Sequence, residues 1–79
     1  MAEVKVYTKN NCVQCKMTKK FLDQAGIGYE EFNIEEEPQY AQELKDAGFR
    51  QAPVVMVPGM DSFSGFRPDQ LKQISQITA

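Results

Sequence analysis

The chain has 79 residues, a formal net charge of −2 at pH 7 and no histidine or tryptophan. A chain of this length has room for one small core, so we expect residues 1–79 to form a single domain. Hydrophobic residues make up 42% and charged residues 25% of the chain, which is ordinary for soluble globular proteins and argues against disorder. The mildly acidic balance leaves no extended basic stripe, so we do not expect binding to nucleic acid.

Two features of the sequence bear on where the protein works. The longest apolar run, residues 54–57, is far too short to cross a bilayer, and residues 1–15 contain no apolar segment of the kind found in secretory signals. A small secreted domain is also expected to carry two or more disulfides, whereas this chain has one pair of cysteines. We therefore expect a cytoplasmic protein that does not associate with membranes.

Hydrophobic periodicity predicts strand, helix, strand and helix in the first half of the chain. Residues 3–8 alternate apolar and polar side chains, as a half-buried strand does, and apolar residues then recur at helical spacing over residues 12–25. Residues 29–34 alternate again. Pro38 suits the first turn of a second helix, which ends near Gly48. The apolar members of the two helices are Val13, Met17, Phe21, Leu22 and Ala25, and then Tyr40, Ala41, Leu44 and Ala47.

The second half of the chain predicts two strands and a final helix. Residues 53–57 form a continuous apolar run, typical of a central strand covered on both faces. Pro58-Gly59 indicates a turn, and residues 60–64 a further short strand. Pro68 begins the last helix, in which three apolar side chains share one face: Leu71, Ile74 and Ile77.

The order of these elements predicts an α/β fold. A strand–helix–strand unit implies that the first two strands are parallel with a right-handed crossover, whereas the tight turn implies that the last two strands form an antiparallel hairpin. We therefore predict a four-stranded mixed sheet with three helices in the order βαβαββα.

The two cysteines, Cys12 and Cys15, lie three positions apart between the first strand and the first helix. Cys12 falls at the N-terminal end of the helix, where free backbone N–H groups and the helix dipole favour an anion, and Cys15 lies one turn further on, close enough for a disulfide. Inert buried cysteines have no reason to gather at a helix start. Structural zinc needs four ligands, so two cysteines would form a metal site only in a dimer.

Thiolate chemistry assigns different roles to the two sulfurs. A thiol with a pKa of about 8.5 is only about 3% ionised at pH 7, and one with a pKa of about 7 is half ionised. Because nucleophilicity falls with pKa, the net gain in attack rate is only about threefold, and the larger benefit is a better leaving group. We therefore assign Cys12 as the nucleophile and Cys15 as the resolving thiol.

Charge is unevenly spread along the chain. Residues 1–20 hold five lysines against one acid, and residues 30–46 hold seven acids against one lysine. Such runs are most often solvated surface. Three of the lysines follow the cysteines closely, however, and cations there would favour a thiolate or steer a docking partner: Lys16, Lys19 and Lys20.

The strand, the Cys-x-x-Cys helix, the later proline before a strand and the final helix together resemble the thioredoxin superfamily. More specifically, Cys-Val-Gln-Cys at 12–15, Gly-Phe-Arg-Gln-Ala-Pro-Val-Val at 48–55 and Ser-Gly-Phe-Arg-Pro-Asp at 64–69 are similar to the glutaredoxin-like NrdH redoxins. The resemblance covers essentially the whole chain and implies a thioredoxin-like fold. Phe63 departs from it, because the family usually has tryptophan there, and phenylalanine lacks the N–H donor.

The resemblance implies roles for further residues. Pro53 would be the cis-proline beside the active disulfide, unless it is an ordinary proline that opens a strand, and the Ala52 backbone would pair with an extended substrate segment. Phe66 and Arg67 would wall the site or tie its loops together, unless they are simply a core residue and a solvated cation. Lys9 lies where glutaredoxins often carry a cation, and it is either a neighbour of the thiolate or solvated.

The resemblance also implies a mechanism and partners. Reduced Cys12 would attack a protein disulfide and Cys15 would resolve the mixed disulfide, with no bound cofactor and with electrons from NADPH through a reductase. The substrate would be a class Ib ribonucleotide reductase, and the electron source a thioredoxin reductase rather than glutathione. Independence of glutathione rests on Val13 and Gln14 in place of the Pro-Tyr of glutaredoxins, together with Ser-Gly-Phe-Arg-Pro at 64–68 where glutaredoxins bind the tripeptide. We expect a monomer. The alternatives are a glutathione-dependent glutaredoxin, and a metal or iron–sulfur binding module that dimerises through its cysteines.

Overall fold

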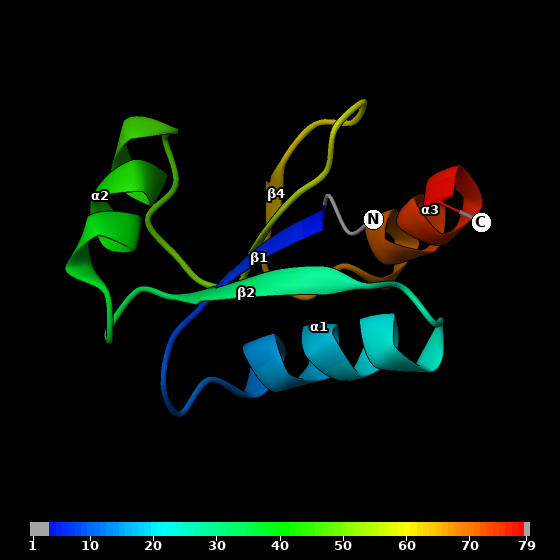
Figure 1. Cartoon of the computed structure of the whole chain (residues 1–79), viewed down its shortest axis with the longest axis horizontal. Helices are drawn as coiled ribbons and strands as arrows, with labels where there is room; N and C mark the ends of the chain where they lie inside the picture. The colour runs from blue at the N-terminus through cyan, green and yellow to red at the C-terminus, as the bar shows by residue number, and fades with distance from the viewer. Residues whose placement is uncertain (1–3, 79) are drawn as a thin grey trace.

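The computed structural model describes residues 4–78, and within them the chain forms four strands and three helices in the predicted order. The elements are β1 (Val4–Thr8), α1 (Val13–Gln24), β2 (Tyr29–Asn33), α2 (Pro38–Asp46), β3 (Val54–Met56), β4 (Phe63–Ser64) and α3 (Pro68–Thr78). The sheet lies in the middle, with α2 on one side and α1 and α3 on the other (Figure 1). No helix within this span is long and apolar enough to cross a membrane. Glu3, expected to start the first strand, lies outside the described residues.

The sheet has the order β2-β1-β3-β4. Strand β1 runs parallel to β2, with Val4 opposite Tyr29, and antiparallel to β3, with Val6 opposite Val55. Strands β3 and β4 pair antiparallel, with Phe63 opposite Val55. The mixed sheet is therefore as predicted, and the apolar strand β3 is central.

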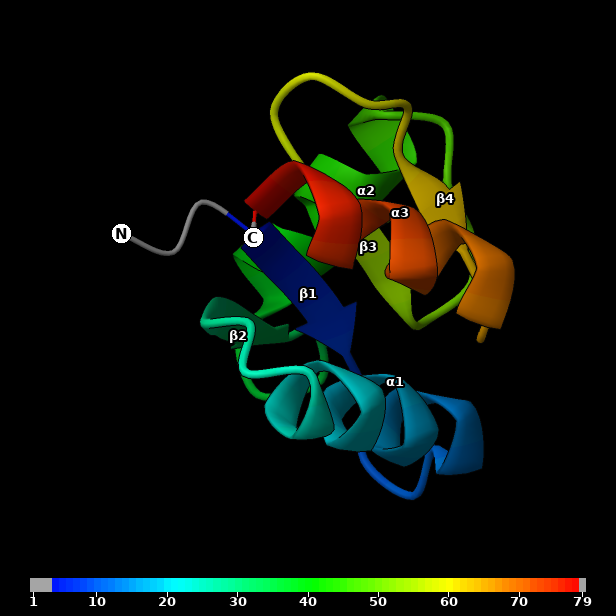
Figure 2. The ribbon, with the colours of Figure 1, turned by 90° about the vertical axis from the view of Figure 1, so that its right-hand side faces the viewer.

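The larger core lies between the sheet and helices α1 and α3, and we refer to this side as the closed face. Successive side chains of a strand point to opposite sides of a sheet, so every second residue of β1 and β3 reaches this core. Figure 2 shows α3 in front of the sheet and α2 behind it. The buried side chains of the closed face are Val4, Val6, Leu22, Ile27, Val55, Val57, Phe63, Leu71 and Ile74.

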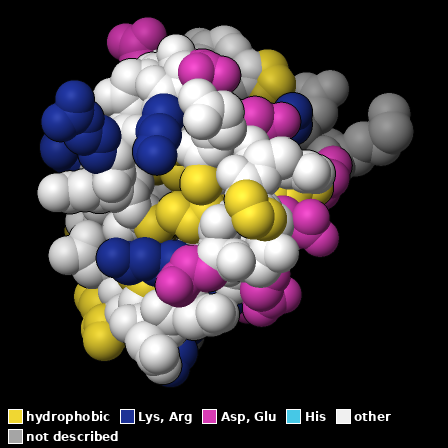
Figure 3. Space-filling view, turned by 90° about the vertical axis from the view of Figure 1, so that its left-hand side faces the viewer, with side chains coloured by type: hydrophobic (Ala, Val, Ile, Leu, Met, Phe, Trp, Pro, Cys, Tyr) yellow, Lys and Arg dark blue, Asp and Glu magenta, His cyan; other side chains and the backbone are white. Residues whose placement is uncertain are grey.

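The side covered by α2 is packed more sparsely, and we refer to it as the open face. Its cluster has three buried residues, Tyr7, Leu44 and Val54. The side chains around them are only partly buried, and they are Phe32, Ile34, Tyr40, Phe49 and Met56. In Figure 3, which looks at this side, hydrophobic side chains reach the surface in the middle, with Lys and Arg on the left and Asp and Glu on the right.

The helices turn somewhat different faces to the sheet from those that the sequence predicts. Val13 and Met17 are 70% and 42% exposed, because α1 directs Cys15, Thr18 and Leu22 inward instead. In the second helix only Leu44 of the predicted apolar stripe is buried. In the last helix Leu71 and Ile74 are fully buried as expected, and the side chain of Ile77 lies outside the described part.

Strand boundaries also differ from the prediction, and the central strand β3 covers residues 54–56 rather than 53–57. Strand β2 ends at Asn33, one residue early, because the Asn33 side chain accepts the backbone N–H groups of Glu35 and Glu36 and so turns the chain. Strand β4 begins at Phe63 rather than at Met60. A turn is present at Pro58-Gly59, but the chain continues as a loop before it pairs again.

Candidate active site

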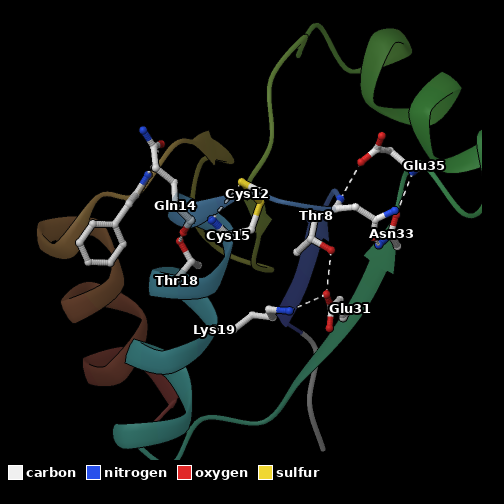
Figure 4. Close-up of a disulfide and its surroundings, with 11 residues drawn as sticks. Thr8, Cys12, Gln14, Cys15, Thr18, Lys19, Glu31, Asn33 and Glu35 are labelled. Carbon is white, nitrogen blue, oxygen red and sulfur yellow. Dashed lines mark hydrogen bonds and ion pairs between the residues drawn. A yellow bond between two sulfur atoms is a disulfide. The ribbon is translucent and has the colours of Figure 1, made fainter.

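Both cysteines lie at the junction where β1 leads into α1, and they form a disulfide with their Cα atoms 5.2 Å apart (Figure 4). Cys12 is the N-cap of α1, with an extended backbone at φ −112° and ψ 109°. The Cys15 N–H donates to Cys12 Sγ at 3.1 Å, and the Lys16 N–H donates to the Cys12 carbonyl at 3.2 Å. The sulfur of Cys12 therefore takes the place of the oxygen in an ordinary N-cap side chain.

The two sulfurs differ in how far they reach solvent. Cys12 is 8% exposed and Cys15 is 2% exposed. An attack by or on a second protein needs direct access to the sulfur, and only Cys12 lies at the surface hollow beside the helix start. The geometry thus separates an outer cysteine from an inner one, in the order that the sequence suggests.

The turn into the helix is sharp. Asn11 has φ +56°, in the left-handed region that few residues other than glycine adopt, and asparagine is among the few. This turn is absent from the elements predicted above, although the Asn-Asn pair before Cys12 is a signal for one.

A shallow hollow of about 380 Å³ adjoins Cys12. Its walls bring Lys9 and Ala52 beside Cys12, together with Val13, Gln14 and Gln51. The Ala52–Pro53 peptide bond is cis, the form that the family resemblance implied, and Pro53 is buried. Residues 40 positions apart in the chain therefore meet at one site.

A second set of contacts ties the segment before α3 to this site. The Gly65 N–H donates to the Pro53 carbonyl at 2.8 Å, and the Phe66 N–H donates to Gln14 Oε1 at 3.3 Å. The Phe66 ring packs against the closed-face core and lines a separate hollow with Met17 and Phe21, so it does not wall the Cys12 hollow. The sequence analysis did not single out the side chain of Gln14 for this link.

The two other cations proposed for the site, Arg67 and Lys16, lie outside the hollow. Arg67 Nε donates to the Ser64 carbonyl at 3.0 Å, so this side chain ties its own loop together. Lys16 is exposed in the first turn of α1 and, within residues 4–78, its side chain makes no hydrogen bond or ion pair.

Lys19, by contrast, is paired. Its Nζ lies 2.9 Å from Glu31 Oε2, and the buried Thr8 hydroxyl donates to the same oxygen at 2.8 Å. Partial burial raises the pKa of Glu31, but the hydrogen bonds from Lys19 and Thr8 and the charge of Lys19 lower it by more, so this pKa lies below its usual value. The three lysines after the cysteines are therefore not one uniform basic cluster.

Metal binding finds no support in this geometry. Among residues 4–78 no group of three or more His, Cys, Asp or Glu side chains is placed to hold a metal ion. A metal or iron–sulfur site that used Cys12 and Cys15 would therefore need further ligands from a second chain or another molecule.

Comparison with known proteins gives consistent matches. The glutaredoxin family model matches residues 4–61. The chain is 46% identical to the glutaredoxin-like protein NrdH of Lactococcus lactis subsp. lactis (strain IL1403) over 72 residues, 91% of this chain and 99% of that protein. It is 42% identical to NrdH of Escherichia coli (strain K12) over 71 residues, 90% of this chain and 86% of that protein. The solved structure of the Escherichia coli NrdH-redoxin, described as having a thioredoxin-like activity profile, matches with a TM-score of 0.85 and 41% identity over 90% of this chain and 92% of that chain.

Proposed function

The chain belongs to the glutaredoxin family, and within it to the glutaredoxin-like NrdH proteins, and from that premise we propose that it carries electrons to disulfides in other proteins. NrdH proteins are thiol–disulfide oxidoreductases. The observation that carries the proposal is the Cys12–Cys15 pair at the start of α1, with the outer sulfur accepting a backbone N–H.

The proposed reaction has two steps. The Cys12 thiolate attacks one sulfur of the substrate disulfide, forms a mixed disulfide and releases the other substrate sulfur as a thiolate, which takes up a proton. Cys15 then loses its proton and attacks Cys12 Sγ, the bond between Cys12 and the substrate breaks, and the second substrate thiol leaves. Two electrons pass to the substrate, and this chain is left in the disulfide form seen in the structure.

Each neighbouring residue has a place in this reaction. The N-cap geometry stabilises Cys12 as a thiolate when it attacks the substrate, and again when the reductase resolves its own mixed disulfide with Cys12 and so releases that thiolate. An extended segment of the substrate pairs with the Ala52 backbone, which lines the hollow next to the buried Pro53. Lys9 lines the same hollow and offers a positive charge to the thiolate or to the partner.

We assign thioredoxin reductase, with NADPH, as the electron source and a class Ib ribonucleotide reductase as the substrate, with the chain acting as a monomer in the cytoplasm. Similarity to NrdH proteins supports this assignment. Glutathione would need donors near the start of α3, where glutaredoxins bind the tripeptide. The Phe66 N–H there is already engaged by Gln14, which favours reduction independent of glutathione.

Coupled assays test the electron source. Reduced chain is mixed with insulin, NADPH and either thioredoxin reductase or glutathione with glutathione reductase, and loss of NADPH absorbance is followed. We expect sustained turnover with thioredoxin reductase. Turnover only with glutathione would replace this assignment with a glutathione-dependent glutaredoxin.

Matched serine variants test the order of the two sulfurs. Cys15→Ser retains the attacking thiol, so we expect it to accumulate a mixed disulfide with an oxidised class Ib ribonucleotide reductase, visible on a non-reducing gel. Cys12→Ser should form none. A mixed disulfide that accumulates with Cys12→Ser instead would reverse the two roles.

A further inference from the structure

The link between β1 and α1 consists of residues 9–12, and it decides where the Cys12 sulfur lies relative to the helix. The chain reverses there through Asn11 at φ +56°. Asparagine adopts this left-handed conformation more readily than most residues, and contacts from outside the link also hold the chain there.

Those contacts come from the last residue of β2 and from the segment that follows it. The Asn10 N–H donates to Glu35 Oε1 at 2.6 Å, and Asn33 Nδ2 donates to Asn10 Oδ1 at 3.0 Å. Figure 4 shows Asn33 at the end of β2 and Glu35 on the segment after it, beside the link that leads to Cys12. One residue of the link is thus held both through its backbone and through its side chain, two positions before Cys12.

The holding side chains are themselves fixed. Asn33 Oδ1 accepts the N–H groups of Glu35 at 2.9 Å and of Glu36 at 3.1 Å, which closes a turn directly after β2. The Ile34 N–H donates to the Thr8 carbonyl at 2.8 Å, so the base of this turn is joined to the end of β1. The Glu35 carboxylate is therefore held against the link by an ordered backbone.

We propose that Asn33 and Glu35 are positioning residues that keep Cys12 at the helix cap and so favour its thiolate, a role that rests on the proposed function. Glu35 acts in two opposite ways. Its negative charge disfavours a nearby thiolate, whereas its hydrogen bond preserves the geometry in which α1 stabilises that thiolate. The two contributions differ in sign, so an experiment can separate them.

The test is the pKa of Cys12 in the reduced protein, obtained from the rate of iodoacetamide alkylation as a function of pH. For Glu35→Ala we expect the pKa to rise by about half to one unit, which lowers the thiolate fraction at pH 7 about two- to fivefold for a starting pKa of about 7 and slows alkylation by less, because the remaining thiolate is more nucleophilic. Removal of a negative charge alone would lower this pKa, so a rise comes from the lost geometry. The variant leaves the other charges near the link in place: Lys9, Lys16 in the first turn of α1, Glu36 beside Asn33, and the Lys19–Glu31 pair.

Three further variants complete the test. Glu37→Ala removes the same charge from the N-cap of α2, where the side chain makes no capping hydrogen bond, and should not raise the pKa. Glu35→Gln keeps an oxygen acceptor and should retain most of the alkylation rate. Asn33→Ala changes no charge and should raise the pKa as Glu35→Ala does.

An unchanged or lowered pKa in Glu35→Ala would overturn the proposal, and so would an equal rise in Glu37→Ala. Circular dichroism establishes that each variant is folded. If Asn33→Ala does not fold, the alkylation rate of Glu35→Gln compared with that of wild type still tests the proposal. Alkylation requires neither reductase nor substrate, so this test can succeed or fail independently of the coupled insulin assays.

Discussion

The two faces of the sheet differ in how completely they are covered. On the closed face two helices bury nine apolar side chains, each at most 8% exposed. On the open face the single helix α2 buries Leu44 against Tyr7 and Val54, and the surrounding aromatic side chains stay partly exposed. Helix α1, which carries the disulfide, belongs to the well-packed side.

The difference shows how a small domain distributes its buried side chains between the two faces of its sheet. A chain of 79 residues cannot fill two large cores, so burial is concentrated where a side chain must be held in place. The inward residues of α1 are Cys15, Thr18 and Leu22, so the helix that caps Cys12 is anchored along its length. The open face keeps α2 in place with packed rings: Tyr7 is stacked on Phe32 with ring centroids 5.2 Å apart, and Tyr40 lies edge-on to Phe32 at 4.8 Å.

The largest expected effect comes from truncating one leucine on each face. Leu22→Ala should lower the free energy of unfolding by about 3 to 4 kcal/mol, because a fully buried side chain leaves a cavity in the closed core. Leu44→Ala should lower it by about 2 kcal/mol, because partly exposed neighbours can collapse into the space. Urea denaturation measures both. Equal losses would show that the two faces are packed equally well.

A second prediction concerns the edge of the closed face near the site. Gly65 has φ +84°, and a Cβ added there would meet Gln14 Oε1 at 3.5 Å, an ordinary contact. Gly65→Ala should therefore lower the free energy of unfolding by about 1 to 2 kcal/mol through backbone conformation alone. Adding Gln14→Ala should not restore the loss in urea denaturation. Restoration would point to a steric clash instead.

The third prediction concerns the outward side of α1. Lys16→Glu should slow association with thioredoxin reductase about threefold at low salt and flatten the salt dependence, because an unpaired exposed cation is free to steer a partner. Lys19→Glu should slow association less, since that charge is already offset by Glu31. Stopped-flow kinetics at several salt concentrations measure both rates. Unchanged association rates for Lys16→Glu would show that Lys16 is a solvated surface residue that does not steer the partner.

The smallest effect is expected where α1 meets β2. The pKa of Glu31 is below its usual value, so the ionised side chain stabilises the fold above the unfolded pKa, near 4.5, and this contribution is lost as the pH falls through the folded pKa. Glu31→Gln should lower the free energy of unfolding by less than about 1 kcal/mol at pH 7. The gap from wild type should shrink by pH 3 in urea denaturation. A gap that grows on acidification would contradict the assignment, and Glu30→Gln is the matched control.

Local patterns predicted the elements, and long-range side-chain contacts escaped prediction. The alternation in β1 and the apolar run of β3 were readily recognised, because the polarity of each residue indicates whether its side chain is buried. The helical spacing of α1 misled at Val13 and Met17, because the partner face is set by α3 and the sheet rather than by the helix itself. Strand β2 ended early through one asparagine side chain.

In the site, too, local features were predicted from the sequence and long-range contacts were not. Cys12 and Cys15 were identified because their spacing and their position at a helix start are local features. The bond from Asn10 to Glu35 spans 25 positions and that from Phe66 to Gln14 spans 52, and no sequence period links such pairs. These contacts exist only once the sheet brings the strand ends together.

The sulfur of Cys12 belongs to two structures at once, the disulfide and the first turn of α1. Because the helix is capped by that sulfur, cleavage of the disulfide leaves the acceptor in place, and ionisation makes it a stronger one. We therefore expect little reorganisation of the backbone between the oxidised and reduced forms. The same surface can meet a protein that delivers electrons and then one that takes them, without a refolding step between the two encounters.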